Sequence, residues 1–300
     1  MIDKEAENME HEKITGKRFF YVTALNIIIT ITEFVGGFVS GSLGLVSDAF
    51  HNLEDSLSIV ISYVANVIGQ RKNNAKKTFG YKRAEILAAF VNSLILVIIT
   101  IMMVFESFKR LNQPQHIDGK LMMIVSVIGL LANLVSMLML MSGSKHNLNI
   151  KATFLHMLTD TLSSVGVFVA SVFVILFNWN WVDPVITILI AIWLLKEAYT
   201  VVSETINILM EASPKIDLTA VEAEIMTVPE IVRVHHMHVW MIDENHIMLD
   251  AHINVLKNCN MKELDSLYDQ VDKLLLEKFN ITHVTLQAEC SRGLDNSLID

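Results

Sequence analysis

The stretch that decides the fold is Ser47-Asp48-Ala49-Phe50-His51-Asn52-Leu53-Glu54-Asp55. It lies within an apolar run over about residues 44–68, which is long enough to cross a bilayer, because a spanning helix needs roughly 20 residues. Charged side chains inside such a run are energetically expensive, and they usually face a partner or a functional cavity. The stretch therefore predicts a membrane span that carries a polar site.

Apolar runs of this kind recur along the chain. Its 300 residues are 52% apolar and 18% charged, with a mean hydropathy of +0.46. This composition excludes a disordered chain, a disulfide scaffold and a nucleic-acid-binding surface, and the spacing of Cys259 and Cys290 predicts reduced thiols. A large buried helix of a soluble protein explains one such run but not six in succession. The predicted spans cover about residues 19–39, 44–68, 84–106, 120–142, 152–177 and 182–203.

The basic residues near the span ends predict the orientation in the cell membrane. Residues 1–18, 69–83 and 143–151 together carry twelve Lys and Arg, whereas residues 107–120 on the opposite side carry three. Both termini are therefore expected in the cytoplasm. Residues 1–18 lack the layout of a cleavable signal, so the first span is expected to serve as its own uncleaved signal.

The fifth predicted span repeats the ionisable pair of the second. His51 and Asp55 are four residues apart, as are His156 and Asp160, so each pair shares one face of its helix. Two such helices, facing each other, offer two imidazoles and two carboxylates, a set that suits tetrahedral Zn²⁺. An intrahelical hydrogen bond within each pair is the alternative, and the repetition in two spans favours the metal site.

Four other polar side chains in the predicted spans are candidates for roles around the two pairs. Asp48 precedes His51 by three residues and is expected to line an access path, while Glu54 is expected to point away. Glu33 and Asn133 are candidates for contacts around the site or for hydrogen bonds between helices, and the second role is favoured for Asn133.

The chain changes character after Ser213-Pro214. Residues 210–300 carry 16 acids and 7 bases, so this part holds the whole net charge of −9. Thr219 and Glu222 have the spacing of a capping box at the start of a short helix. The order α-β-β-α-β predicts a small α+β, ferredoxin-like domain with its helices on one sheet face. The later elements are expected as strands at 231–241 and 246–255, a helix at 260–279 and a last strand at 281–289.

These observations predict the fold class and the domain organisation. The fold is an all-α membrane domain of six helices followed by the small cytoplasmic α+β domain. The expected parts are a cytoplasmic tail at 1–18, the transmembrane domain at 19–209, the cytoplasmic domain at 210–290 and a flexible tail at 291–300.

Three motifs make the chain resemble the cation diffusion facilitators, most closely their zinc-transporting branch. They are Ser42–His51 with Asp55, Thr78–Leu87, and His156 with Asp160. The resemblance implies a homodimeric antiporter that exports Zn²⁺, and also Cd²⁺ or Co²⁺, from the cytoplasm in exchange for protons, with no organic cofactor. His51, Asp55, His156 and Asp160 would form its transport site. The connection at 142–147 is not His-rich, which points to a bacterial-type member.

The resemblance also implies a metal site in the cytoplasmic domain, which would sense metal and support dimerisation. By matching position this site falls on His235, His252 and Glu289, with His283 as a fourth ligand, and Zn²⁺ would be its regulatory ligand. Gln287 stands where some relatives have a ligand. Strand alternation puts His236 on the face opposite to its neighbour His235, and solvated strand histidines are the alternative interpretation.

Two other functions compete with transport by alternating access. A membrane-embedded zinc hydrolase needs three ligands, an open water position and a general base, for which Asp48 or Glu54 is a candidate. A metal sensor needs an output module. The four symmetric ligands close the site, which argues against the hydrolase, and the sequence shows no output module for a sensor.

Overall fold

The computed structural model describes residues 24–141, 148–256, 260–293 and 295–299. The chain divides into two compact units, one formed by residues up to Tyr63 with Val91–Thr200, and the other by Val64–Phe90 with Val201–Asp300. Residues 1–18, the connection at 142–147 and Cys259 lie outside the described residues, so the predictions made for them stay predictions.

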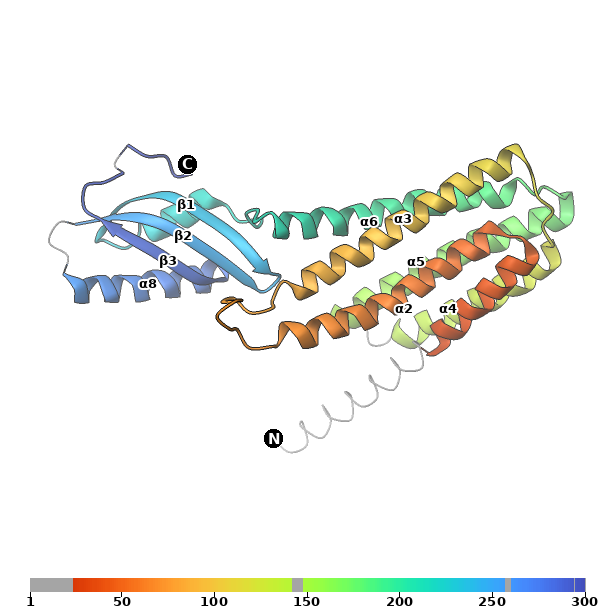
Figure 1. Cartoon of the computed structure of the whole chain (residues 1–300), viewed down its shortest axis with the longest axis horizontal. Coiled ribbons are helices and arrows are strands. Elements are labelled where there is room, and N and C mark those ends of the chain that lie inside the picture. Colours follow the sequence, from red (N-terminus) through yellow and green to blue (C-terminus); the bar gives the residue numbers. More distant parts are fainter. Residues whose placement is uncertain (1–23, 142–147, 257–259, 294, 300) are drawn as a thin grey trace, which may run out of the picture. The chain divides into compact units, whose positions relative to one another are not determined.

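Helices follow the six predicted apolar runs (Figure 1). Within the described residues, four of them are long and apolar enough to cross a membrane, namely α3 to α6. The second helix is less apolar because it contains the polar stretch 47–55. The bounds are Ala24–Ser40 for the first helix, Leu43–Gly69 for α2, Ala84–Asn112 for α3, Gly119–Met141 for α4, Leu148–Phe177 for α5 and Val182–Leu209 for α6.

Two helices continue beyond their apolar runs. The third was expected to end near residue 106, but α3 continues to Asn112 with Lys109 and Arg110 in its last turn, where cations interact favourably with the helix dipole. The sixth continues from about residue 203 to Leu209. A helix is not obliged to end where its apolar residues do, so hydropathy alone underestimates both lengths.

The membrane helices bury small and branched apolar residues between them. Leu45 of α2, Met122 of α4 and Val167 of α5 are almost fully buried in one cluster with residues of α6. Large apolar side chains such as Phe38, Phe105 and Leu176 remain exposed on the outward faces. This arrangement suits helices that are surrounded by lipid, since the outward surface need not be polar.

The C-terminal part has the predicted α-β-β-α-β order. Its three-stranded sheet has the order β1-β2-β3, in which β1 and β2 are antiparallel and β2 and β3 are parallel. The parallel pair is joined through α8, which lies along one face of the sheet (Figure 1). The core of this C-terminal part contains the fully buried Leu249, Val271 and Leu275. The bounds are Leu218–Ile225 for α7, Ile231–Asp243 for β1, His246–Val255 for β2, Met261–Phe279 for α8 and Ile281–Glu289 for β3.

The helix caps correct one prediction of the sequence. The expected capping box at Thr219 and Glu222 is wrong, because Asp217 is the N-cap of α7 and accepts a hydrogen bond from the Thr219 amide. A capping box is present at α8 instead, between Asn260 and Glu263. An Asp two residues earlier offers a better acceptor than the Thr219 hydroxyl, which itself donates to Asp217.

Candidate metal centre

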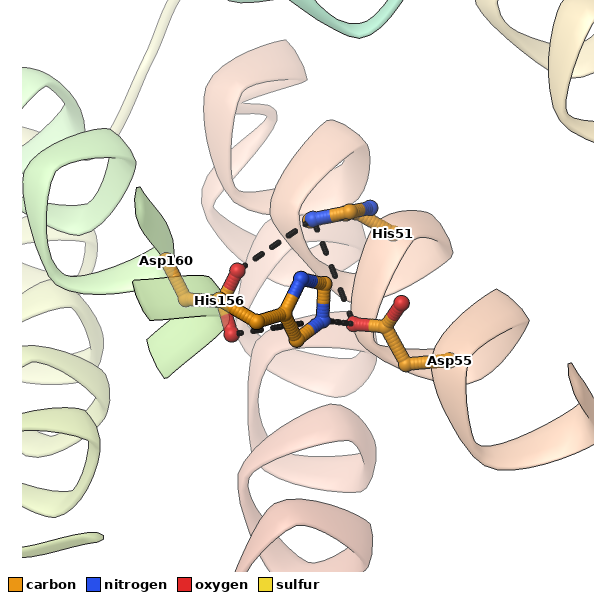
Figure 2. A group of neighbouring side chains, drawn as sticks. All are labelled: His51, Asp55, His156 and Asp160. Carbon is orange, nitrogen blue, oxygen red and sulfur yellow. Dashed lines mark ion pairs between the residues drawn. The ribbon is translucent and has the colours of Figure 1, made fainter. Parts of the chain in front are cut away.

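The structure brings the two predicted His–Asp pairs together between α2 and α5 (Figure 2). One ligand atom from each of His51, Asp55, His156 and Asp160 lies within 4.8 Å of all the others. His51 and Asp160 are buried, while the side chains of Asp55 and His156 are 15% and 31% exposed. Access to the group is therefore from the side of Asp55 and His156. We call these four residues the tetrad.

The shortest contacts in the tetrad run between the helices. His156 Nε2 lies 2.9 Å from Asp55 Oδ2, and the two contacts within a helix, His51 to Asp55 and His156 to Asp160, are both 3.9 Å. Neighbouring ligand atoms around a tetrahedral Zn²⁺ are about 3.3 Å apart, given metal–ligand distances near 2.0–2.1 Å. The tetrad already has nearly this spacing, which is the spacing of a set of ligands rather than of two intrahelical hydrogen bonds.

Several tetrad atoms have no hydrogen bond within the described residues. They include His51 Nε2, Asp55 Oδ2 and both carboxylate oxygens of Asp160, all of them buried. Their contacts within the tetrad are the ion-pair contacts given above, and buried polar atoms that lack well-aligned hydrogen bonds cost free energy. A divalent cation at the centre would satisfy these atoms together, and two carboxylates would neutralise its charge.

Asp48 does not join the tetrad, although it lies one helical turn from His51. Its carboxylate accepts hydrogen bonds from the hydroxyl groups of Ser163 and Ser164 on α5, the second at 3.1 Å. The Asn133 amide of α4 donates to Ser164 Oγ at 3.2 Å. Asp48 therefore links α2 to α5, and Asn133 has the interhelical role that the sequence favoured.

Two other carboxylates hold α2 to its neighbours. The Asn52 amide donates to Glu33 Oε2 at 2.8 Å, so the first helix is tied to the residue next to His51. Glu54 accepts from the Asn92 amide of α3, and the same amide lies 2.9 Å from Ser58 Oγ. Glu54 thus ties α2 to α3.

The start of α2 is capped from a distant part of the chain. Asp183, at the beginning of α6, accepts hydrogen bonds from Ser42 Oγ at 2.6 Å, from the Leu43 amide at 2.7 Å and from the Gly44 amide at 3.1 Å. The side chain is fully buried, and a carboxylate at a helix N-terminus satisfies amides that have no partner within the helix. Sequence reasoning missed this cap, and its only signal was an acid at the start of an apolar run.

The cytoplasmic domain contains a second group of possible ligands. His235 of β1, His252 of β2 and Glu289 at the end of β3 lie together. Glu289 Oε2 is 3.4 Å from His235 Nε2, and Glu289 Oε1 is 3.5 Å from His252 Nδ1. The antiparallel register pairs His235 with His252 directly. The strands therefore bring together three of the four residues expected for the cytoplasmic site.

The fourth expected residue, His283, is exposed on β3 and pairs in register with Met248, so the described geometry does not include it in the group. Gln287 is closer, since its amide donates to Glu289 Oε1 at 2.6 Å. Burial raises the pKa of the Glu289 carboxyl, but this hydrogen bond and the nearby His252 outweigh burial, and the pKa lies below its usual value. Glu289 is thus held in the ionised form that binds metal.

A β-bulge alters the expected alternation of β1. The register shifts between His235 and His238, and His236 has a left-handed φ of 51°. As a result the His236 ring lies 4.7 Å from the ring of His252, instead of facing away from it. The His236 and Met237 amides donate to backbone oxygens of Ser297 and Leu298. The flexibility expected for residues 291–300 stays a prediction, but backbone hydrogen bonds place part of this segment on the bulge.

Comparison with known proteins covers both parts of the chain. Residues 19–210 match the family model described as the cation efflux transmembrane domain, and residues 213–291 match that of the cation efflux protein, cytoplasmic domain (ZT_dimer). Two relatives share 36% identity with the chain. The cadmium, cobalt and zinc/H(+)-K(+) antiporter of Bacillus subtilis matches over 96% of this chain and 93% of its own length. The zinc transporter ZitB of Escherichia coli matches over 93% and 88%.

A third relative is the metal cation efflux system protein CzcD of Cupriavidus metallidurans. It is 38% identical over 269 residues, which cover 89% of this chain and 84% of that protein. The similarity to all three relatives therefore spans the membrane helices and the C-terminal domain together.

Proposed function

The chain belongs to the cation efflux family, and on this premise we propose that it exports Zn²⁺ from the cytoplasm in exchange for protons. Cd²⁺ and Co²⁺ are further substrates, since relatives named as antiporters carry these metals in their names. The observation that carries the proposal is the convergence of two imidazoles and two carboxylates between α2 and α5.

The geometry of the tetrad supports transport by alternating access. Each helix supplies one imidazole and one carboxylate, and the shorter contacts cross from helix to helix. A shift of α5 away from α2 therefore lengthens both contacts between the helices, His51 to Asp160 and His156 to Asp55, and these involve all four ligands. A bound cation favours the arrangement that closes the tetrad, and a change of that arrangement releases it, because a ligand biases conformations only through its differential affinity.

Protons compete with Zn²⁺ for the tetrad. Metal binding needs neutral imidazole and ionised carboxylate, and imidazole exchanges protons near neutral pH. Protonation on the outer side therefore promotes release of Zn²⁺, and loss of those protons on the cytoplasmic side restores the ligands. This competition supplies the exchange without a separate proton site.

The same premise supports the proposed assembly and topology. We propose a homodimer, because the matched cytoplasmic domain is the one designated ZT_dimer. A cytoplasmic N-terminal segment is part of the proposal, and it is supported by the count of six spans, which return the chain to the side from which it started. Zn²⁺ at His235, His252 and Glu289 is proposed to regulate transport by drawing the acidic domains of two copies together.

Family membership decides between transport and the hydrolase alternative. The chain is a transporter and not an enzyme, since both family matches and the named relatives are cation efflux proteins. The contacts of the two candidate bases agree with this, because Asp48 is engaged by Ser163 and Ser164, and Glu54 by Asn92. The same matches favour transport over signalling by a sensor.

Flux through reconstituted protein tests the proposal. The full chain in proteoliposomes, with a zinc indicator and a pH indicator inside, is expected to move Zn²⁺ and protons in opposite directions. Glu106→Ala is a matched control, because Glu106 is a carboxylate on a membrane helix that pairs with Lys109 and Arg110 near its end. Zinc movement without any proton signal would replace the antiporter with a uniporter, and no zinc movement in either protein would overturn the transport function.

A further inference from the structure

The unit formed by residues 64–90 and 201–300 contains a cavity that metal transport does not use. Its volume is about 740 Å³, and all of its lining residues belong to this unit. Lys76, Lys77 and Lys82 are among them, with Phe79 and with Trp240 of β1. The cavity thus combines a basic rim with apolar and aromatic walls.

A hydrogen-bonded hairpin presents the basic side chains. The backbones of Asn74 and Lys77 exchange two hydrogen bonds, at 3.1 and 3.0 Å, and the Gly80 amide donates to the Lys77 carbonyl at 2.9 Å. Gly80 has a φ of +75°, a conformation that glycine adopts without strain. The side-chain amide of Asn73 also donates to the Thr78 carbonyl at 3.1 Å. The lysines therefore project from a backbone held in one conformation.

The charges around the cavity are unbalanced. Arg83 forms an ion pair with Glu211 at 3.1 Å. No ion pair with a carboxylate is found for Lys76, Lys77 or Lys82 in the described ranges, and Lys77 Nζ instead lies 4.9 Å from the centre of the Tyr81 ring. After the Arg83–Glu211 pair is counted, three positive charges remain, so the cavity favours an anion.

The hairpin lies at the cytoplasmic surface of the membrane. It joins the end of α2 to the start of α3, and four spans separate it from the cytoplasmic domain, so both are on the same side. The cytoplasmic leaflet carries anionic lipids that attract basic segments next to membrane helices. An apolar wall suits the glycerol and acyl region of a lipid, while ammonium groups suit its phosphate.

We propose that this cavity binds the phosphate of an anionic phospholipid headgroup from the cytoplasmic leaflet. The proposal is independent of metal transport. It also differs from a general topological role for these lysines, because a topological signal requires only charge near the span and not a position on a cavity. Arg71 and Lys72 allow the lipid site to be distinguished from the topological role. They lie in the same connection and carry the same charge, but they do not line the cavity.

Native mass spectrometry of the purified full chain tests the proposal. Phosphatidylglycerol and phosphatidylcholine are added in turn, and the number and affinity of bound lipids are compared. The Lys76→Gln/Lys77→Gln protein is expected to lose phosphatidylglycerol binding by roughly tenfold or more, since each basic residue adds to attraction at an anionic surface. The Arg71→Gln/Lys72→Gln protein is the matched control and is expected to stay within about twofold of the parent, because these two residues do not line the cavity.

The Lys76→Arg/Lys77→Arg protein keeps both charges and is expected to retain the lipid, which separates lost charge from a disturbed hairpin. Equal losses in the two Gln proteins would reduce the effect to general surface charge and overturn the site. Equal binding of phosphatidylcholine and phosphatidylglycerol by the parent would also overturn it. Inorganic phosphate is added as a competitor. If phosphate displaces the lipid completely at low concentration, the cavity takes a free phosphate and the lipid assignment is wrong.

Discussion

His51 lies closer to Asp160 of α5 than to Asp55 of its own helix. The His51 Nε2 to Asp160 Oδ1 distance is 3.3 Å, and the distance from the same nitrogen to Asp55 Oδ2 is 3.9 Å. The polar group is therefore a property of two helices together, and neither His–Asp pair is complete alone. Removal of either carboxylate would leave a bound divalent cation without a balanced charge, and removal of either imidazole would leave it with three ligands.

The first prediction concerns Asp160. Asp160→Ala removes one of two carboxylates, so zinc affinity is expected to fall by more than about a hundredfold, beyond the 10- to 100-fold typical for residues outside the ligand set. Zinc flux should fall to the level of empty vesicles while size-exclusion chromatography shows the same oligomer. Glu106→Ala, on a membrane helix but outside the tetrad, should transport normally. Parent-like flux through Asp160→Ala would remove this residue from the transport site.

Metal choice provides a second prediction. His51→Asp replaces an imidazole with a harder oxygen ligand, so the preference is expected to move from Zn²⁺ toward larger or harder cations such as Cd²⁺ and Mn²⁺. The measurement is competitive uptake of the metals into the same vesicles. An unchanged Zn²⁺ to Cd²⁺ ratio would mean that His51 does not touch the transported ion.

The dependence of zinc affinity on pH gives a third prediction. Imidazole exchanges protons in the range between about pH 5 and pH 8, and a protonated imidazole cannot bind metal. Zinc affinity of the tetrad is therefore expected to weaken as the pH falls through this range. Calorimetric titration in buffers of different ionisation enthalpy should show protons released on zinc binding. Zinc binding without proton release at any pH in this range would contradict competition at the tetrad.

A fourth prediction concerns the buried cap of α2. Asp183→Ala leaves the Leu43 and Gly44 amides without their acceptor in a buried place, where an unsatisfied group costs about 1–3 kcal/mol. The melting temperature of the full chain should fall, and zinc affinity should fall with it because the cap positions the start of α2. Asp217→Ala is the matched control, since it removes the exposed N-cap of α7. If both variants melt alike, burial of the Asp183 cap adds nothing to stability.

The cytoplasmic group gives the last prediction. The His235→Ala/His252→Ala protein should bind less zinc per chain, while its tetrad still binds the metal. Coupling between distant sites is typically 5- to 150-fold, so the zinc concentration that activates transport should rise by roughly fivefold or more. His238→Ala/His246→Ala removes two histidines of the same sheet that lie outside the group. An identical zinc content in both double variants and the parent would leave His235 and His252 as ordinary strand residues.

Some of this structure was predictable because it depends on local spacing. The separation of four residues between His51 and Asp55, and between His156 and Asp160, fixes which face of each helix carries the ligands. The apolar runs predict where the membrane helices lie. The strand and helix patterns predict the order of the elements in the cytoplasmic domain. These features depend on helical and strand periodicity, which is visible in a single sequence.

Other features depend on where distant segments meet, and the sequence did not show them. The bulge at His236 breaks the period of two that places alternate residues on opposite faces, so the predicted position of that ring was wrong. The capping of α2 by Asp183 joins residues 139 to 141 positions apart. The cavity beside the hairpin needs Trp240, which is remote in sequence from Lys76. No local sequence pattern predicts such contacts between residues that are far apart in the chain.

The cap of α2 also has a consequence for how the protein is made. During synthesis α2 enters the membrane before Asp183 has left the ribosome. The Leu43 and Gly44 amides therefore have no bond to the Asp183 carboxylate at that stage. The helix that carries His51 and Asp55 is therefore completed only when the sixth span arrives. A nascent chain that stops after the fifth span holds all four tetrad residues and still lacks the residue that finishes the first turn of α2.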